Sequence, residues 1–171
     1  MRPAEQIRYL ILAAQREGNR QIATAMSQFG LTPAQSEALR IVADHGPLSL
    51  KDIGDMLVCD SGTSPSRIVE RLVAAGLVQR DVGEHDRRRV RLTATDDGRT
   101  LSARILAREN QLYDFIDHAI DADEATTLLR VLHTLTHGSP AGSALENRRA
   151  AERLLHTHRD NGAQDRQGEQ P

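Results

Sequence analysis

Aromatic residues are scarce in this chain: two Tyr, two Phe and no Trp make up 2% of its 171 residues. Proteins that bind single-stranded nucleic acid stack bases on aromatic side chains, so the scarcity argues against that class, and against carbohydrate sites. Cysteine is limited to Cys59, so no intrachain disulfide can form and a reducing compartment is favoured. The formal net charge is only −2, so any contact with nucleic acid must come from a local basic patch.

Long apolar runs are also missing. No segment is long enough to span a bilayer, and the N-terminus lacks the apolar core and cleavage site of a signal peptide. We therefore expect a cytoplasmic protein without a membrane partner or cofactor. The length fits one domain with a polar tail, and its core must be aliphatic.

Aliphatic residues at three- and four-residue spacing predict four helices before residue 77. They are expected at about 3–28, within 30–47, within 48–60 after a strand-like Leu-Ser-Leu, and within 61–78. Thr32 and Gln35 form a capping box around Pro33, which fills the first helical position. Ser64 with Pro65 gives the same start to the fourth helix, where Ser64 is the expected N-cap.

Two segments that alternate apolar and polar residues, 77–82 and 89–92, predict a β-hairpin. Thr93 and Asp96 are expected to cap a long helix over 94–119. Asp121 starts another helix that ends near His137, with leucines facing inward. Residues 139–171 are polar, and we expect a linker, a marginal helix and a disordered end there. The predicted fold is mainly α with a small β-hairpin, divided into an N-terminal helix (1–30), a winged helix-turn-helix (31–93), two C-terminal helices (94–138) and a flexible tail (139–171).

Two short helices followed by a hairpin are typical of a winged helix-turn-helix, whose second helix enters the major groove of DNA. Hydroxyls and guanidiniums at the start of the fourth helix suit contacts with base edges and phosphates. The candidate residues are Thr63, Ser64, Ser66, Arg67 and Arg71. Each alone is equally compatible with an ordinary role, since Ser64 can be only a cap and exposed arginines are common on helices. The combination favours DNA recognition.

The segment 80-RDVGEHDRRRVRLT-93 lies at the predicted hairpin tip, or wing. Its candidate DNA-binding residues are Asp86, Arg87, Arg88 and Arg89. Arginine at such a tip can enter the minor groove, where the negative potential attracts it. Asp86 can orient Arg88, and which arginine occupies the tip stays open.

Three motifs resemble the MarR family of winged-helix regulators: "PLSLKDIGDML", "SPSRIVERLVAAGLVQR" and "DRRRVRLTATDDGR". The resemblance covers about residues 5–138, and residues 32–101 carry most of it. It implies a homodimer held by the N-terminal helix and the two helices predicted within 94–138, and binding to a pseudo-palindromic operator on double-stranded DNA, usually as a repressor. It also implies release by a small, often aromatic, effector that binds between the dimerisation and DNA-binding regions. The family pattern places groove contacts at 63–67 and the wing pair at Asp86 and Arg88.

The sequence also contains candidate metal-ligating and redox-active residues. His133 and His137 have the spacing of metal ligands, but no further ligand converges on them, so we expect no metal site. Cys59 fits a small buried hydrophobe better than a redox switch. No catalytic motif is present, so we do not expect an enzyme. The alternative function is a winged-helix module that binds another protein or acts architecturally, without sensing a ligand.

Overall fold

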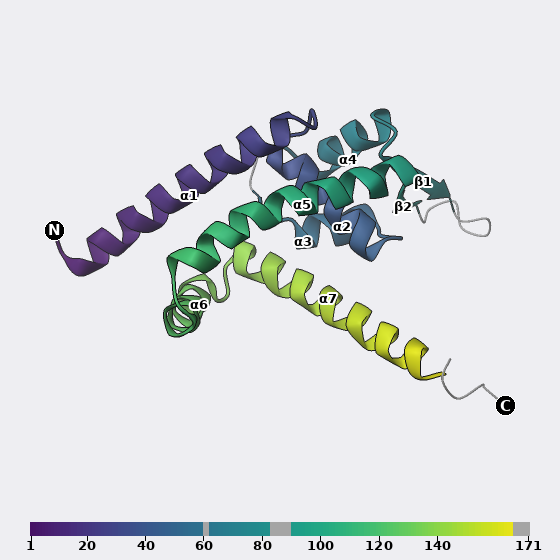
Figure 1. Ribbon diagram of the computed structural model, residues 1–171. Helices are drawn as coiled ribbons and strands as arrows, with labels where there is room; N and C mark the ends of the chain where they lie inside the picture. The colour runs from purple at the N-terminus through teal and green to yellow at the C-terminus, as the bar shows by residue number, and fades with distance from the viewer. Residues whose placement is uncertain (60–61, 83–89, 166–171) are drawn as a thin grey trace.

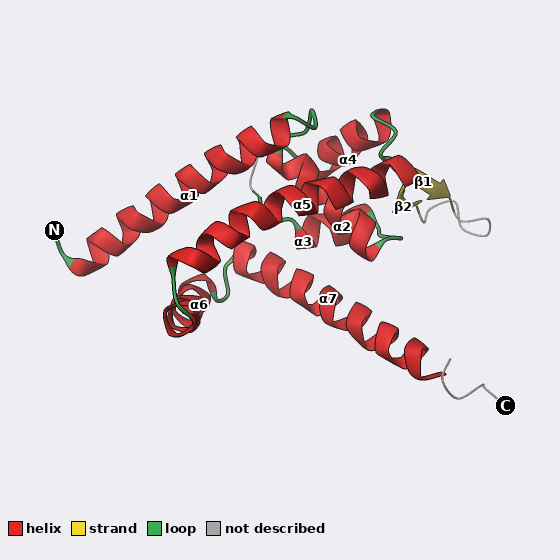
Figure 2. Cartoon of the chain, viewed as in Figure 1, coloured by secondary structure: helices red, strands yellow, loops and turns green. Residues whose placement is uncertain are grey.

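The computed structural model describes residues 1–59, 62–82 and 90–165 (Figure 1). Seven helices and one antiparallel hairpin occupy these ranges. They are α1 (Pro3–Ser27), α2 (Pro33–His45), α3 (Leu50–Met56), α4 (Pro65–Ala74), β1 (Val78–Val82), β2 (Val90–Ala94), α5 (Asp96–Ala119), α6 (Ala122–Thr136) and α7 (Pro140–Asp165). Figure 2 shows that helices dominate and that the strands lie at the end of the molecule away from the N-terminus. The mainly helical fold with a small hairpin is confirmed.

Helix α2 is the centre of the core, because it packs against α1, α3, α4, α5, α7 and β2. Its apolar residues were predicted to be buried, and four of them are at most 1% exposed: Ala38, Leu39, Ile41 and Val42. They meet aliphatic side chains from the surrounding elements, among them Met26, Ile53, Ile68, Val69, Leu72, Val78, Leu92 and Ile105. Burial of this aliphatic surface, at roughly 25 cal/mol per Å², is what fixes the helix-turn-helix against α5.

Capping residues decide where the short helices begin. The Thr32 hydroxyl accepts a hydrogen bond from the Gln35 backbone N–H, and the Gln35 side chain accepts one from the Thr32 N–H, as predicted. Ser49 and Asp52 form the same reciprocal box at the start of α3. Leu50 therefore belongs to a helix, and the strand expected around it is reduced to one antiparallel bridge between Leu48 and Leu92.

One predicted cap is wrong, and another occupies its predicted position without a side-chain capping bond. Helix α5 is capped by Thr95, whose hydroxyl accepts from the Gly98 N–H at 3.0 Å, and not by Thr93. Thr93 is held in β2 opposite Gln79, and its hydroxyl donates to Asp81 at 2.6 Å. Ser64 does occupy the N-cap position of α4, but its side chain makes no capping bond.

The C-terminal segment contains more helix than expected: α7 spans Pro140–Asp165, so it includes the marginal helix predicted there and replaces the predicted linker. The Ser139 hydroxyl accepts from the Gly142 N–H at 3.1 Å, which starts the helix. Ala144 is 7% exposed, and α7 lies along α3, so small side chains near its start let the two helices approach closely. The side chains beyond residue 154 are not described.

The leucines of α6 were expected to face inward, but within one chain they are not buried. No residue of α6 is buried, and large apolar side chains of α1, α5 and α6 are exposed. They include Ile7, Leu10, Leu12, Tyr113, Phe115, Ile116, Leu128, Leu129 and Leu135. A cavity of about 600 Å³ with an almost wholly apolar lining lies between α1 and α6. Among the described residues no helix is long and apolar enough to cross a membrane.

Candidate DNA interface

Helix α4 is strongly two-sided. Ile68, Val69 and Leu72 are at most 3% exposed and fasten the helix to the core. Arg67 and Arg71 lie on the exposed side. Because the buried residues fix the rotation of the helix about its axis, the arginines are presented outward on a rigid element. This is the arrangement that a recognition helix requires.

The hydroxyl-bearing residues gather at the N-terminal end of α4. Ser64 is exposed, Thr63 and Ser66 are half-buried, and the Ser64 and Ser66 hydroxyls lie 3.0 Å apart. Ser64 therefore occupies the N-cap position while its hydroxyl bonds to Ser66 and makes no capping bond to the backbone. Backbone N–H groups in the first turn of a helix favour a phosphate oxygen, and two hydroxyls beside them add hydrogen-bonding capacity.

A pocket with a volume of about 210 Å³ lies between α4 and the hairpin. Ser66 and Glu70 line it from α4, and Arg80 lines it from β1. Arg80 was not among the residues expected from the sequence to contact DNA, although the alternation in 77–82 placed a cation on that strand. Its exposed side chain adds positive charge between the helix and the wing.

An ion pair joins the hairpin to the helix-turn-helix. Arg91 Nη1 of β2 lies 3.8 Å from Asp52 Oδ2 of α3. Hydrogen bonds from Ser49, followed by the charge of Arg91, hold the pKa of Asp52 below its usual value. The carboxylate therefore stays ionised at neutral pH and keeps Arg91 on the α3 side of the hairpin.

The predicted wing residues Asp86, Arg87, Arg88 and Arg89 lie outside the described residues. The paired strands that carry them are described, with Val82 opposite Val90 as the last pair before the tip. The hairpin is thus present, and the role of each wing residue stays a prediction.

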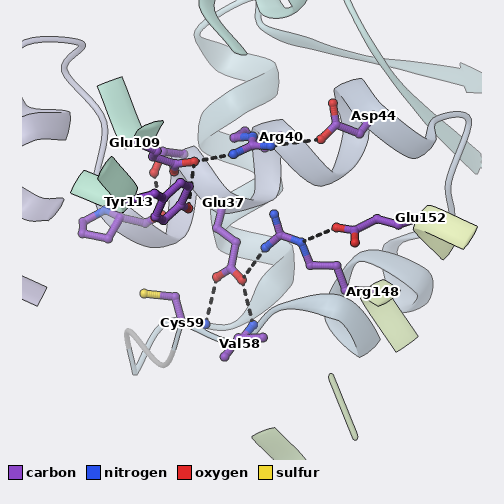
Figure 3. Close-up of polar contacts among 11 residues, drawn as sticks. Glu37, Arg40, Asp44, Val58, Cys59, Glu109, Tyr113, Arg148 and Glu152 are labelled. Atoms are coloured by element: carbon purple, nitrogen blue, oxygen red, sulfur yellow. Dashed lines mark hydrogen bonds and ion pairs between the residues drawn. The ribbon is translucent and has the colours of Figure 1, made fainter. Parts of the chain in front are cut away.

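A polar network around Glu37 of α2 was not predicted from the sequence (Figure 3). Glu37 of α2 accepts hydrogen bonds from the backbone N–H groups of Val58 and Cys59, at 3.0 and 2.8 Å. Arg148 of α7 donates to the same carboxylate at 3.3 Å. The partners are up to 111 residues apart, so no local pattern could have revealed them.

One turn along α2, Arg40 forms an ion pair with Glu109 of α5, and both side chains are 13% exposed. Tyr113 donates to Glu109 at 3.5 Å. Burial, and then the Glu109 charge, raises the pKa of Tyr113, so its phenol stays protonated. A cavity of about 440 Å³ lies beside these residues, and α1, α2, α5 and α7 supply its walls. Its polar lining includes Gln15, Asn19, Glu37, Arg40, Tyr113 and Arg148.

The two candidate metal ligands, His133 and His137, contact different partners. His133 Nε2 lies 2.5 Å from an Arg149 nitrogen, and His137 lies 4.0 Å from Glu146. In the described part of the chain no group of three or more potential ligands could hold a metal ion. Cys59 is half-buried and packs against the core, as expected of a small apolar side chain.

Comparison with known proteins gives a consistent picture. Residues 31–98 match a family model described as a winged helix DNA-binding domain. The chain is 32% identical over 101 residues to the organic hydroperoxide resistance transcriptional regulator of Bacillus subtilis, covering 59% of this chain and 68% of the relative.

Two solved structures share the fold. One is a mutant MarR from E. coli complexed with operator DNA, with a TM-score of 0.66, 24% identity and coverage of 76% of this chain and 93% of that one. The other is BpsR of Bordetella bronchiseptica, whose DNA binding is regulated by 6-hydroxynicotinic acid, with a TM-score of 0.69, 24% identity and coverage of 81% and 99%. The relatives are transcription regulators, and the matched domain is the one that contains α4 and the hairpin.

Proposed function

The chain belongs to the MarR family of winged-helix, DNA-binding transcriptional regulators, and we propose that it acts as a homodimeric repressor that a small effector releases from its operator. The observation that carries this proposal is the two-sidedness of α4. One side is locked into the core, and the other offers Ser66 and Arg67 beside an uncapped helix start.

In the proposed complex, α4 enters the major groove with its N-terminal turn first. Arg67 is the residue we assign to base contact, because a guanidinium can bond to guanine through two parallel hydrogen bonds. Ser64, Ser66 and the first-turn N–H groups bind phosphate, and Thr63 and Arg71 flank them. The wing, with Arg88 oriented by Asp86, follows into the neighbouring minor groove.

The exposed apolar faces of α1, α5 and α6 support the homodimer. A soluble monomer seldom exposes so much contiguous apolar surface, and a two-fold pairing of identical chains would cover it. Such a dimer carries two recognition helices about 34 Å apart, one turn of B-DNA, which matches a pseudo-palindromic operator.

The cavity beside Arg40 is the effector site we propose. Two guanidiniums, the carboxylates of Glu109 and Glu37 that pair with them, a protonated phenol and two amides face a space of about 440 Å³, which fits a small polar molecule such as a hydroxylated aromatic compound. BpsR supports this idea, because 6-hydroxynicotinic acid, which regulates its DNA binding, is a hydroxylated aromatic acid. An effector can release DNA only if it binds the DNA-free arrangement of the two α4 helices more tightly.

Footprinting of the DNA beside the protein's own gene, with and without candidate aromatic acids, tests this function. We expect protection of two half-sites about ten base pairs apart and its loss when the effector is added. Affinity should fall steeply with salt, by about 0.9 units of log K per unit of log [salt] for each phosphate contacted. A flat salt dependence, with no preference over competitor DNA, would instead favour the protein-docking alternative.

A further inference from the structure

The backbone just after α3, at Val58 and Cys59, leads toward the N-terminal end of α4, and a side chain from α2 binds it. Glu37 projects from α2, and its two carboxylate oxygens accept the backbone N–H groups of Val58 and Cys59 (Figure 3). These N–H groups lie just past the end of α3, where the backbone becomes extended at Leu57 and the chain leaves the helical hydrogen-bonding pattern. Hydrogen bonds to a carboxylate are stronger than hydrogen bonds between neutral groups. Glu37 therefore holds the backbone at Val58 and Cys59 relative to α2.

Arg148 completes the contact from the opposite direction. Its Nη1 lies 3.3 Å from Glu37 Oε1, the same oxygen that accepts the Val58 N–H, and its Nε lies 3.6 Å from Glu152. Glu37 is only 13% exposed and Arg148 22%, so water can replace neither partner easily. Removal of Arg148 would leave a partly buried carboxylate without its counter-charge, which favours rotation of that carboxylate toward solvent.

Helix α7 is seated firmly enough to present Arg148. Ala144 is buried, and the Asn147 side chain donates to the Asp55 carbonyl of α3 at 3.0 Å. A side chain at Gly142 would meet the Thr136 carbonyl oxygen at 2.2 Å, so the start of α7 fits closely against the end of α6. The helix therefore contacts the DNA-binding helices through α3, in addition to Glu37.

From these contacts we propose that Arg148 and Glu37 are positioning residues for the recognition helix, and that α7 thereby sets the DNA-binding geometry of α4 from outside the winged domain. The proposal rests on the proposed DNA-contacting role of α4. Arg148 keeps the Glu37 carboxylate on the amides of Val58 and Cys59, and these amides tie the chain to α2 shortly before the N-terminal end of α4. Neither residue need touch DNA.

Full-length Arg148→Ala, Arg148→Lys and Glu37→Gln test the proposal, with Arg149→Ala as the matched control. Arg149 is the next residue of α7 and also makes a cross-helix contact, but its partner is His133 of α6. The first readout is the amide proton shift and hydrogen exchange of Val58 and Cys59 by NMR, without DNA. We expect both amide signals to move upfield and exchange faster in Arg148→Ala, and one of them to do so in Glu37→Gln, which keeps a single acceptor oxygen.

The second readout is affinity for the footprinted operator against unrelated DNA at equal salt. We expect Arg148→Ala to weaken operator binding about threefold to thirtyfold, with non-operator binding unchanged, as for other residues that couple sites without touching the ligand. Arg148→Lys should recover part of the loss, and Arg149→Ala should have no effect. Unchanged amides in Arg148→Ala, or an equal loss in Arg149→Ala, would overturn the proposal. If Arg148→Ala fails to fold, the same two readouts on Arg148→Lys and Glu37→Gln decide.

The two proposals fail differently. If α4 does not contact DNA, the amide shifts still appear, while Arg67→Ala leaves operator binding intact. If the pair does not position the backbone at Val58 and Cys59, Arg67→Ala weakens operator binding and the amides of Arg148→Ala stay where they are.

Discussion

Replacing Leu128 and Leu135 of α6 by alanine should weaken the proposed dimer by about three orders of magnitude. The two side chains are 47% and 59% exposed in the single chain, so roughly half of each remains to be buried by a partner. Full burial of a leucine contributes about 1.5–3 kcal/mol, so each contributes about 1 kcal/mol on association. Two leucines from each of two protomers give about 4 kcal/mol, and every 1.4 kcal/mol is a factor of about ten in Kd.

Sedimentation equilibrium over a range of concentrations measures this dissociation constant. Leu154→Ala on α7, where the leucine is 63% exposed, is the matched control and should leave the dimer Kd unchanged. The double variant should unfold at the same midpoint temperature as a dissociated wild-type monomer, because neither leucine is buried within one chain. A wild-type chain that is monomeric at micromolar concentration, or a double variant that dimerises as tightly as wild type, would refute the reasoning.

Two further predictions concern stability. Gly98→Ala should lower the free energy of unfolding by about 2 kcal/mol or more, because the new Cβ would lie 2.0 Å from the Leu77 carbonyl oxygen; an unchanged urea midpoint would contradict this contact. Burial lowers the pKa of His45 below its ordinary value of 6.5, and its Nδ1 has no hydrogen-bond partner among the described residues. The folded state therefore favours the neutral ring, so the free energy of unfolding should fall as the pH drops through about 6.5. His45→Gln should make the unfolding free energy less dependent on pH, as measured by urea titrations at pH 5.5–7.5. An equal pH dependence in the variant would exclude His45 as its source.

Local chemistry made much of the fold predictable from the sequence. The capping box of Thr32 and Gln35 needs only four residues, and both of its hydrogen bonds are present. The alternation in 77–82 and 89–92 likewise fixed the hairpin, because its period is a property of the strand backbone. The same locality explains the two-sidedness of α4, whose buried residues follow helical spacing.

Choices that depend on distant partners were not predictable. Thr93 and Thr95 are equally plausible caps by composition, and only the pairing of β2 with β1 removes Thr93 from the helix start. Helix α7 is polar, and only a marginal helix was expected there, yet burial of one small residue, Ala144, and polar contacts to α2 and α3 hold it against the core. Glu37 and Arg40 were unremarkable on α2, because their partners come from α7, α5 and the α3–α4 turn.

Operator titration of Arg67→Ala against wild type, at one salt concentration and beside unrelated competitor DNA, tests the central claim most directly. Arg108→Ala, an exposed arginine of α5 away from the winged domain, is the control for loss of one positive charge. We predict that Arg67→Ala loses about 1–3 kcal/mol of operator affinity and part of its sequence preference, while Arg108→Ala behaves as wild type. Equal operator affinity for Arg67→Ala and wild type would contradict the assignment of α4 as the helix that recognises DNA.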